Sequence, residues 1–331
     1  MKGATPYLPI LVAVAALAVL PVSATSNTLL NFLTFALIVT LAAQGWNLLA
    51  GYGGQFSFGH AAFFGTGAYA MALLQVRFGV NAWAALPVAV LLGAAVGFAI
   101  GFLAFRARLR GAYFALVTLA FAEVFRILAN AWAFTGGAAG VLVPLRLQVS
   151  AMQFEDKRAL YWLALGFVAA VLVLTAAVAR SRFGARLVAL RENEDAARAL
   201  GVDTLRVKLG AITLSAGITA LAGCLYTQKF LYLDAGLAYG TWISVEALLA
   251  PIVGGLGTVF GPLIGALVLL GLGETTKIAI GHVLSGSLPG IDLVVFGALL
   301  VLVVAYAPNG VIGLADRLLR RRPRPAGEGA P

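Results

Sequence analysis

The sequence predicts an all-α protein, a polytopic transmembrane helical bundle. Two observations lead to this fold class. Of the 331 residues, 61% are hydrophobic and only 11% are charged, whereas a soluble domain has about 25% charged residues. The hydrophobic residues also form long unbroken runs without the alternation of a half-buried strand. Because backbone groups in lipid must bond to one another, such runs form transmembrane helices.

The hydrophobic runs predict about ten membrane spans within a single permease-like domain, residues 1–331. The span 242–256 is short and ends in two glycines, so a re-entrant segment is its alternative. The run 8–22 also resembles a signal peptide, although an uncleaved first helix is favoured in a chain with so many further spans. The expected spans are residues 8–22, 28–50, 56–76, 84–105, 112–130, 159–179, 207–230, 242–256, 259–280 and 289–307.

The basic residues predict the orientation of these spans. Sixteen of the 23 Lys and Arg residues lie in segments that ten spans place in the cytoplasm, and an excess of positive charge marks cytoplasmic loops. The segment 180–208 and the basic tail 317–331 are therefore expected inside, with 131–158 and 231–240 outside. This distribution relates the net charge of +10 to topology and anionic membrane lipid, not to nucleic acid. The expected location is a bacterial inner membrane.

The segment 180–208 contains a short helix, expected over residues 193–201. Asn193 suits the N-cap position, and the acidic pair Glu194-Asp195 falls in the first turn, where the helix dipole favours negative charge. Gly201 suits the left-handed position that ends a helix. Asp203 or Thr204 then caps the next helix. The result is a rigid helical element on the cytoplasmic face.

The pattern Asp195-Ala196-Ala197 followed by Gly201 resembles the EAA motif of ABC-importer permeases, with Asp in place of the usual Glu. In those permeases the motif helix docks into a cleft on the ATPase subunit. The resemblance implies that Glu194, Asp195, Ala196, Ala197 and Gly201 couple the chain to an ATPase. The family's later Ile-x-Leu-Pro element is matched by residues 212–215, one residue late and with serine in place of proline. From the residues alone, a solvated, well-capped loop helix is an equal alternative.

Three blocks together resemble the branched-chain amino-acid ABC permeases, M-type (LivM-like) subunit. They are residues 182–201, the stretch from Gly51 to Gly65, and residues 253–262, in the family's order. The resemblance implies a transport subunit, not an enzyme, whose substrate arrives on a periplasmic binding protein. It also implies a second permease of the H-type and two ABC ATPase subunits as partners. The chain itself would bind no cofactor, because ATP belongs to those ATPases.

Two alternatives remain open at this stage. A urea or short-amide permease of the same family would carry the same motifs. An ion-coupled secondary transporter belongs to a different class and would need ion ligands near the membrane midplane. The sequence has no G-x-x-x-x-G-K-[ST] motif for binding ATP. Its two histidines and one cysteine are far apart, so no metal site is predicted.

Glycines after the second span predict a helix break near the membrane's inner edge. Free N–H groups at such a break can receive a substrate carboxylate, and a polar packing cluster is an equal alternative. Glu246, within the span 242–256, either lines the pathway or bonds to a neighbouring helix. The candidate pathway residues are Gly53, Gly54, Gln55, Ser57, His60 and Glu246.

Small residues recur at every fourth position in three places, which predicts close helix contacts. The favoured set for such packing is Gly257, Gly261 and Gly265, and contact within this chain is favoured over contact with a partner. The other sets are Ser57, Ala61 and Gly65, and Gly93, Gly97 and Gly101. Glu123 with Arg126, and Glu274 with Lys277, are expected to form pairs three residues apart.

Overall fold

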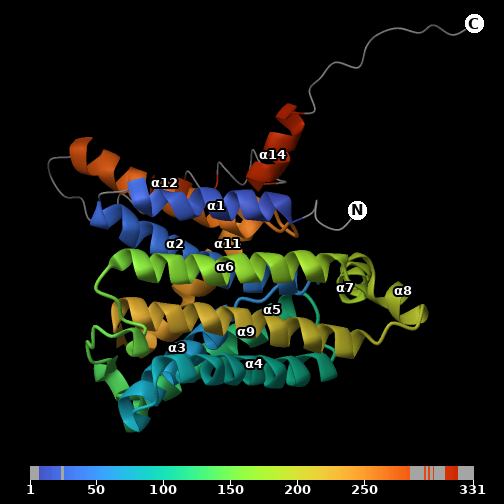
Figure 1. Cartoon of the computed structure of the whole chain (residues 1–331). Helices are drawn as coiled ribbons and strands as arrows, with labels where there is room; N and C mark the ends of the chain where they lie inside the picture. The colour runs from blue at the N-terminus through green and yellow to red at the C-terminus, as the bar shows by residue number, and fades with distance from the viewer. Residues whose placement is uncertain are drawn as a thin grey trace, which may run out of the picture.

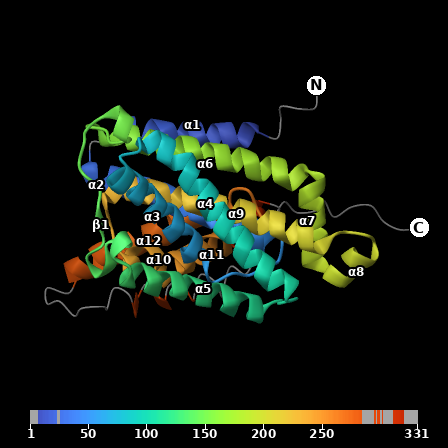
Figure 2. The same ribbon diagram turned by 90° about the horizontal axis from the view of Figure 1, so that it is seen from below.

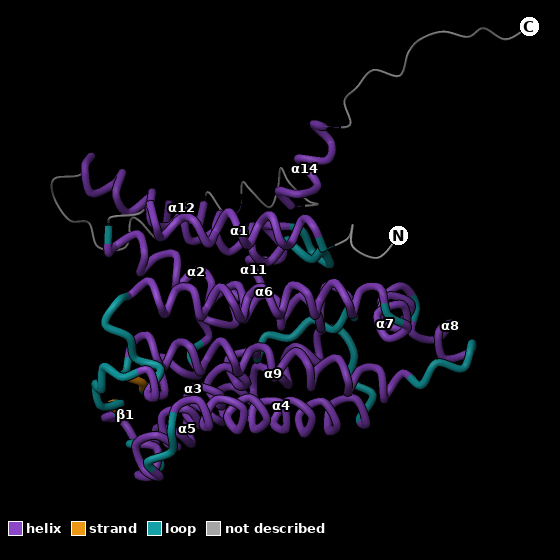
Figure 3. Tube along the Cα trace, in the orientation of Figure 1, coloured by secondary structure: helices purple, strands orange, loops and turns teal. Residues whose placement is uncertain are grey.

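The long helices of the chain lie side by side in a bundle, as the computed structural model shows (Figure 1). The structure describes residues 7–23, 26–283 and 310–319, with five more between 294 and 301. Within these residues the protein is all-α apart from one two-residue ladder (Figure 3). In that ladder β1 (Val141–Leu142) pairs antiparallel with β2 (Tyr232–Leu233). The all-α prediction is therefore confirmed.

The described helices follow one another with short connections. The first half of the chain contains α1 (Leu8–Ser23), α2 (Asn27–Trp46), the π-helix η1 (Asn47–Tyr52), α3 (His60–Phe78), α4 (Ala82–Arg106), α5 (Ala112–Ala131) and the short turns η2 (Ala133–Thr135), η3 (Gly137–Ala139) and η4 (Val149–Ala151). The second half contains α6 (Lys157–Arg180), α7 (Arg182–Glu192), α8 (Glu194–Ala199), α9 (Thr204–Phe230), α10 (Ala235–Tyr239), α11 (Thr241–Gly254), α12 (Gly261–Val283) and α14 (Gly310–Leu319).

Six helical segments of the described chain are long and apolar enough to cross a membrane. Two shorter apolar helices, at Leu8–Val22 and Gly261–Thr276, add to them. The protein is therefore a multi-pass membrane protein, while the count of about ten spans stays a prediction. The last expected span, 289–307, lies largely outside the described residues. The six segments are Asn27–Tyr52, Ala82–Arg106, Ala112–Ala131, Lys157–Arg180, Thr204–Phe230 and Ala235–Gly254.

The centre of the bundle is formed by α2 with η1 and by α9. Each is 72% buried over its most apolar window, more than the other four segments. Helix α9 packs against α2, α3 and α4. The glycines of α4 allow its backbone to approach α9 closely, because a Cβ at each would collide with an α9 side chain. These contacts pair Gly93 with Ala220, Gly97 with Ala216 and Gly101 with Ile212.

The glycine set at 257, 261 and 265 differs from the expectation. Helix α12 begins only at Gly261, and Gly257 lies in the preceding turn with a φ of +71°. The three residues therefore do not share one helix face. A Cβ at Gly261 would collide with the carbonyl of Gly255, and one at Gly265 with the carbonyl of Ala250. These contacts lie within the chain.

Helices α7 and α8 lie at one end of the bundle, and β1 lies at the opposite end (Figures 1 and 2). The β1–β2 ladder joins the segments 131–158 and 231–240, both of which were expected outside. The segment 180–208, expected inside, contains α7 and α8. The predicted topology requires this separation.

Candidate functional site

Helix α8 is short and capped at both ends. The Asn193 side-chain oxygen accepts from the N–H groups of Asp195 (3.1 Å) and Ala196 (3.0 Å). At the other end Gly201 has a φ of +84° and donates to the carbonyl of Arg198 (2.9 Å). The N–H of Val202 reaches back to the carbonyl of Ala197 (3.1 Å), which completes a Schellman motif. Asp203 then caps α9 through the N–H of Arg206.

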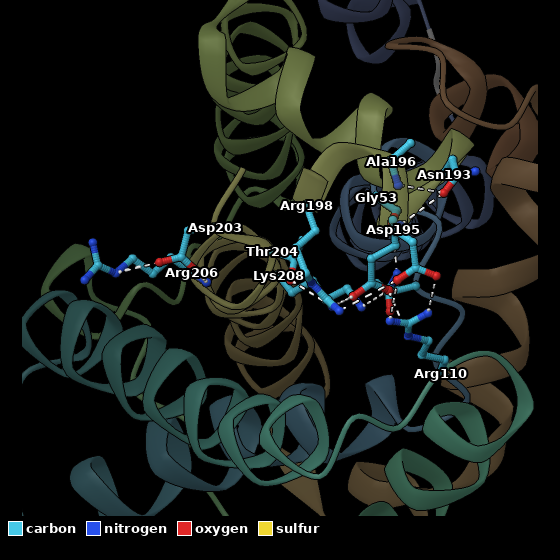
Figure 4. A network of polar contacts seen from close by, with 12 residues as sticks. Gly53, Arg110, Asn193, Asp195, Ala196, Arg198, Asp203, Thr204, Arg206 and Lys208 are labelled. Carbon is cyan, nitrogen blue, oxygen red and sulfur yellow. Dashed lines mark hydrogen bonds and ion pairs between the residues drawn. The ribbon is translucent and has the colours of Figure 1, made fainter. Parts of the chain in front are cut away.

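Glu194 is the centre of an ion-pair cluster that holds α8 against the bundle (Figure 4). Its carboxylate lies 2.6 Å from the Lys208 ammonium, 3.3 Å from Arg110 Nε and 3.1 Å from Arg198 Nη2. The Glu194 side chain is 14% exposed and that of Lys208 only 5%. The Lys208 ammonium also lies 5.4 Å from the ring centre of Phe105 on α4. Because Lys208 belongs to α9 and Arg110 precedes α5, the cluster fixes α8 to two other parts of the chain.

Asp195, beside Glu194, makes a second contact with Arg110. The two Arg110 terminal nitrogens donate to its two oxygens at 3.1 and 3.3 Å. The hydrogen bond from Arg110 lowers the pKa of Asp195 below its ordinary value, and the same bond raises the pKa of Arg110. Unlike Glu194, Asp195 keeps 71% of its side chain exposed.

The five residues predicted to couple the chain to an ATPase divide between the two faces of α8. Glu194 and Ala197 face the protein, whereas Asp195, Ala196 and Gly201 face outward. The outward face also contains Ala199 and Leu200, and Leu200 is 86% exposed. We call Asp195, Ala196, Ala199, Leu200 and Gly201 the α8 surface. Sequence reasoning missed Leu200, although an apolar residue just before a helix-ending glycine was available as a signal.

The predicted helix break lies between η1 and α3, and a second break lies beside it. The Asn47 amide joins them, since its nitrogen donates to the carbonyl of Thr258 (2.9 Å) and its oxygen accepts from the N–H of Gly257 (2.8 Å). Gln44, one turn earlier, donates to the carbonyl of Val259 (2.8 Å). We call the segments 53–59 and 255–260 the paired loops. Polar residues within the apolar run 28–50 were the signal that sequence reasoning did not use.

His60 begins α3 and is fully buried in a small polar cluster. Its Nε2 lies 2.9 Å from Ser215 Oγ, and its Nδ1 lies 3.2 Å from Ser57 Oγ. Ser215 donates its hydroxyl hydrogen to the carbonyl of Gly45 (2.6 Å), so its oxygen accepts from Nε2 of a neutral imidazole. This geometry is that of the polar packing alternative. A pathway role for His60 and Ser57 stays a prediction.

The remaining candidate pathway residues lie around the break. Gly53 follows η1, and Gly54 has a φ of +66°. Gln55 donates to the carbonyl of Gly53 (3.2 Å). Glu246 lies half-buried on α11, the helix whose Ser244 accepts from the first turn of α3. Separately, Glu123 and Arg126 form the expected pair, at 2.5 and 2.9 Å, whereas the side chain of Lys277 lies outside the described residues.

The fold and this surface define a class of protein. A membrane-crossing bundle with a rigid, exposed short helix at one end is a membrane transport subunit, not an enzyme. A family model described as "Branched-chain amino acid transport system / permease component" matches residues 28–304. The chain belongs to that family, and the resemblance stated from its sequence blocks is confirmed.

Curated relatives agree with this assignment. The chain is 29% identical to the high-affinity branched-chain amino acid transport system permease protein LivM of Escherichia coli, over 94% of this chain and 76% of the relative. It is 27% identical to the permease protein BraD of Pseudomonas aeruginosa, over 86% and 94% respectively. A shorter match, 32% identical over 56% of the chain and 54% of the relative, is the autoinducer 2 import system permease protein LsrC of Salmonella choleraesuis. No solved structure matches the chain.

Proposed function

We propose that the chain is a permease subunit of an ATP-driven importer for branched-chain amino acids in a bacterial inner membrane. Its partners would be a second permease of the H-type, two ABC ATPase subunits and a periplasmic binding protein. Two LivM relatives, from Escherichia coli and Salmonella typhimurium, carry this substrate class in their names and align with 94% and 87% of the chain. The chain would supply part of the transmembrane pathway and no chemistry.

The α8 surface is the observation that carries the proposal. It presents small residues around one large apolar side chain, Leu200, at the end of the bundle expected in the cytoplasm. A helix that receives force must not melt, and α8 is held by two caps and by the Glu194 cluster. Leu200 is suited to fill a pocket on a partner, because a buried apolar anchor within a small interface contributes most of the binding energy. The ATPase is the expected partner.

Reconstitution of the complex in liposomes tests the proposal. The chain, an H-type permease, the ATPases and a binding protein would be combined, with ATP enclosed on the ATPase side. We expect labelled leucine to accumulate only when ATP and binding protein are both present. A fivefold excess of unlabelled valine should compete, whereas the same excess of urea should not.

The same assay separates the two alternatives. Uptake that follows a proton or sodium gradient without ATP would indicate a secondary transporter and overturn the proposal. ATP-dependent uptake of urea or a short amide, without uptake of leucine, would keep the ABC class and overturn the substrate. The family assignment does not favour either alternative.

A further inference from the structure

We propose that Arg191 is a positioning residue that links α8 to the paired loops, so that movement of the coupling helix moves the helix breaks. The inference rests on the proposed function and names the contact through which coupling would reach the membrane part of the chain. Arg191 lies in the last turn of α7, two residues before the N-cap of α8.

The guanidinium group of Arg191 is fixed in orientation by two neighbours. Its Nη1 donates to the carbonyl of Gly51 in η1 at 2.9 Å. Its Nε and Nη2 both donate to one carboxylate oxygen of Glu192, at 3.1 and 2.7 Å. A charged donor on a carbonyl acceptor forms one of the stronger hydrogen bonds of a protein. The carbonyl of Gly51 lies where the backbone leaves the helical run, so the bond holds the start of the break.

Both paired loops fit closely around the same side chain. A Cβ on Gly54 would lie 2.9 Å from Arg191 Cγ and 3.2 Å from its Cα. A Cβ on Gly257 would lie 3.3 Å from Arg191 Nη1. Both glycines have positive φ values, +66° and +71°, which residues with a Cβ rarely adopt. Each loop therefore approaches Arg191 in a backbone conformation that favours glycine.

A continuous path of contacts joins the α8 surface to the two breaks. The N-cap Asn193 belongs to both α7 and α8, since its N–H donates to the carbonyl of Ala189 (3.0 Å) and its side chain caps α8. Arg191 connects α7 to Gly51, and the Asn47 amide connects that turn to Gly257. Spatial connection alone does not establish coupling, so the proposal is stated together with its test.

Three variants of the reconstituted complex test the link through the amount of leucine transported per ATP hydrolysed. We expect Arg191→Gln to lower this ratio at least about fivefold, and Arg191→Lys, which keeps a charged donor, to restore it to within about twofold. Arg186→Gln on the same helix is the matched control, because Arg186 is exposed, and it should leave the ratio unchanged. A normal ratio in Arg191→Gln, or equal loss in Gln and Lys variants, overturns the link.

Amide hydrogen exchange in the purified full-length chain tests the link without any partner or Arg191 variant. Asn193→Ala removes the N-cap and should loosen α8. If α8 and the paired loops open as one unit, exchange will also rise at residues 51–59 and 255–260. A rise confined to α8 overturns the proposal, including in the case where Arg191→Gln does not assemble. Failure of the wild-type complex to import leucine would instead overturn the proposed function alone.

Discussion

The ammonium group of Lys208 lies 2.6 Å from the carboxylate of Glu194, and both side chains are largely withdrawn from solvent. Lys208 comes from the first turns of the central helix α9, and Glu194 is the first residue of α8. The ion pair therefore anchors a six-residue helix, which would be too short to persist alone, to the most buried part of the bundle. The position of the α8 surface depends on this pair.

Glu194→Gln is expected to destabilise the protein by about 3 kcal/mol, because it leaves the buried Lys208 ammonium without its carboxylate. The measurement is thermal unfolding of the purified chain in detergent. Asp195→Asn is the matched control, since Asp195 is 71% exposed and the loss of an exposed pair costs less than about 1 kcal/mol. Equal destabilisation by the two variants would show that Glu194 does not anchor the helix.

The α8 caps could be predicted from sequence, whereas its anchor could not. Asn193, Gly201 and Asp203 act on backbone groups within three residues, so local spacing is sufficient. Glu194 meets Lys208 14 positions away and Arg110 from another helix pair. Those contacts depend on how the helices pack, which the sequence of one segment does not specify.

The same distinction explains the breaks. Glycines at 51–54 predicted that α2 is interrupted, and the interruption is present. That it lies beside the segment 255–260 depends on Asn47 contacts spanning more than 200 residues of sequence. The four-residue spacing at Gly257, Gly261 and Gly265 was misleading because Gly257 is not helical. Periodicity identifies a helix face only where the helix continues.

Gly261→Leu is expected to destabilise the chain by roughly 1–3 kcal/mol or more, because there is no room for a side chain there. A Cβ would collide with the carbonyl of Gly255 and lie 2.7 Å from Thr258 Oγ1. Gly271→Leu on the same helix is the control, since a Cβ there meets nothing within 4 Å. The melting temperature in detergent measures both. An unchanged value for Gly261→Leu would contradict the close contact between α11 and α12.

Cysteine labelling of intact cells is expected to show that the two ends of the bundle face opposite sides of the membrane. Leu145→Cys, in the segment 131–158, should react with an impermeant maleimide added outside. Leu200→Cys should react only after the membrane is opened. Both leucines are exposed, and the native Cys224 is buried and should stay unreactive. The reverse pattern would contradict the orientation predicted from the 23 basic residues.

Gly201→Trp is expected to leave the bundle folded and to abolish transport. A Cβ at Gly201 meets nothing within 4 Å, so the chain loses only the glycine preference of a left-handed position, about 1 kcal/mol. The indole ring would, however, project from the α8 surface beside Leu200 and prevent close docking of a partner. ATP-dependent leucine uptake and stimulated ATP hydrolysis in the reconstituted complex should therefore both be lost.

Gly201→Asn separates docking from backbone conformation, because asparagine tolerates left-handed φ values and adds far less volume. It should retain most transport, and the two variants should melt within about 1 kcal/mol of each other. Transport at the native rate by Gly201→Trp would mean that the α8 surface is not a docking site. Loss of transport in both variants, with normal melting, would place the requirement in the glycine turn itself, because the Schellman motif then needs a conformation that only glycine supplies at this position.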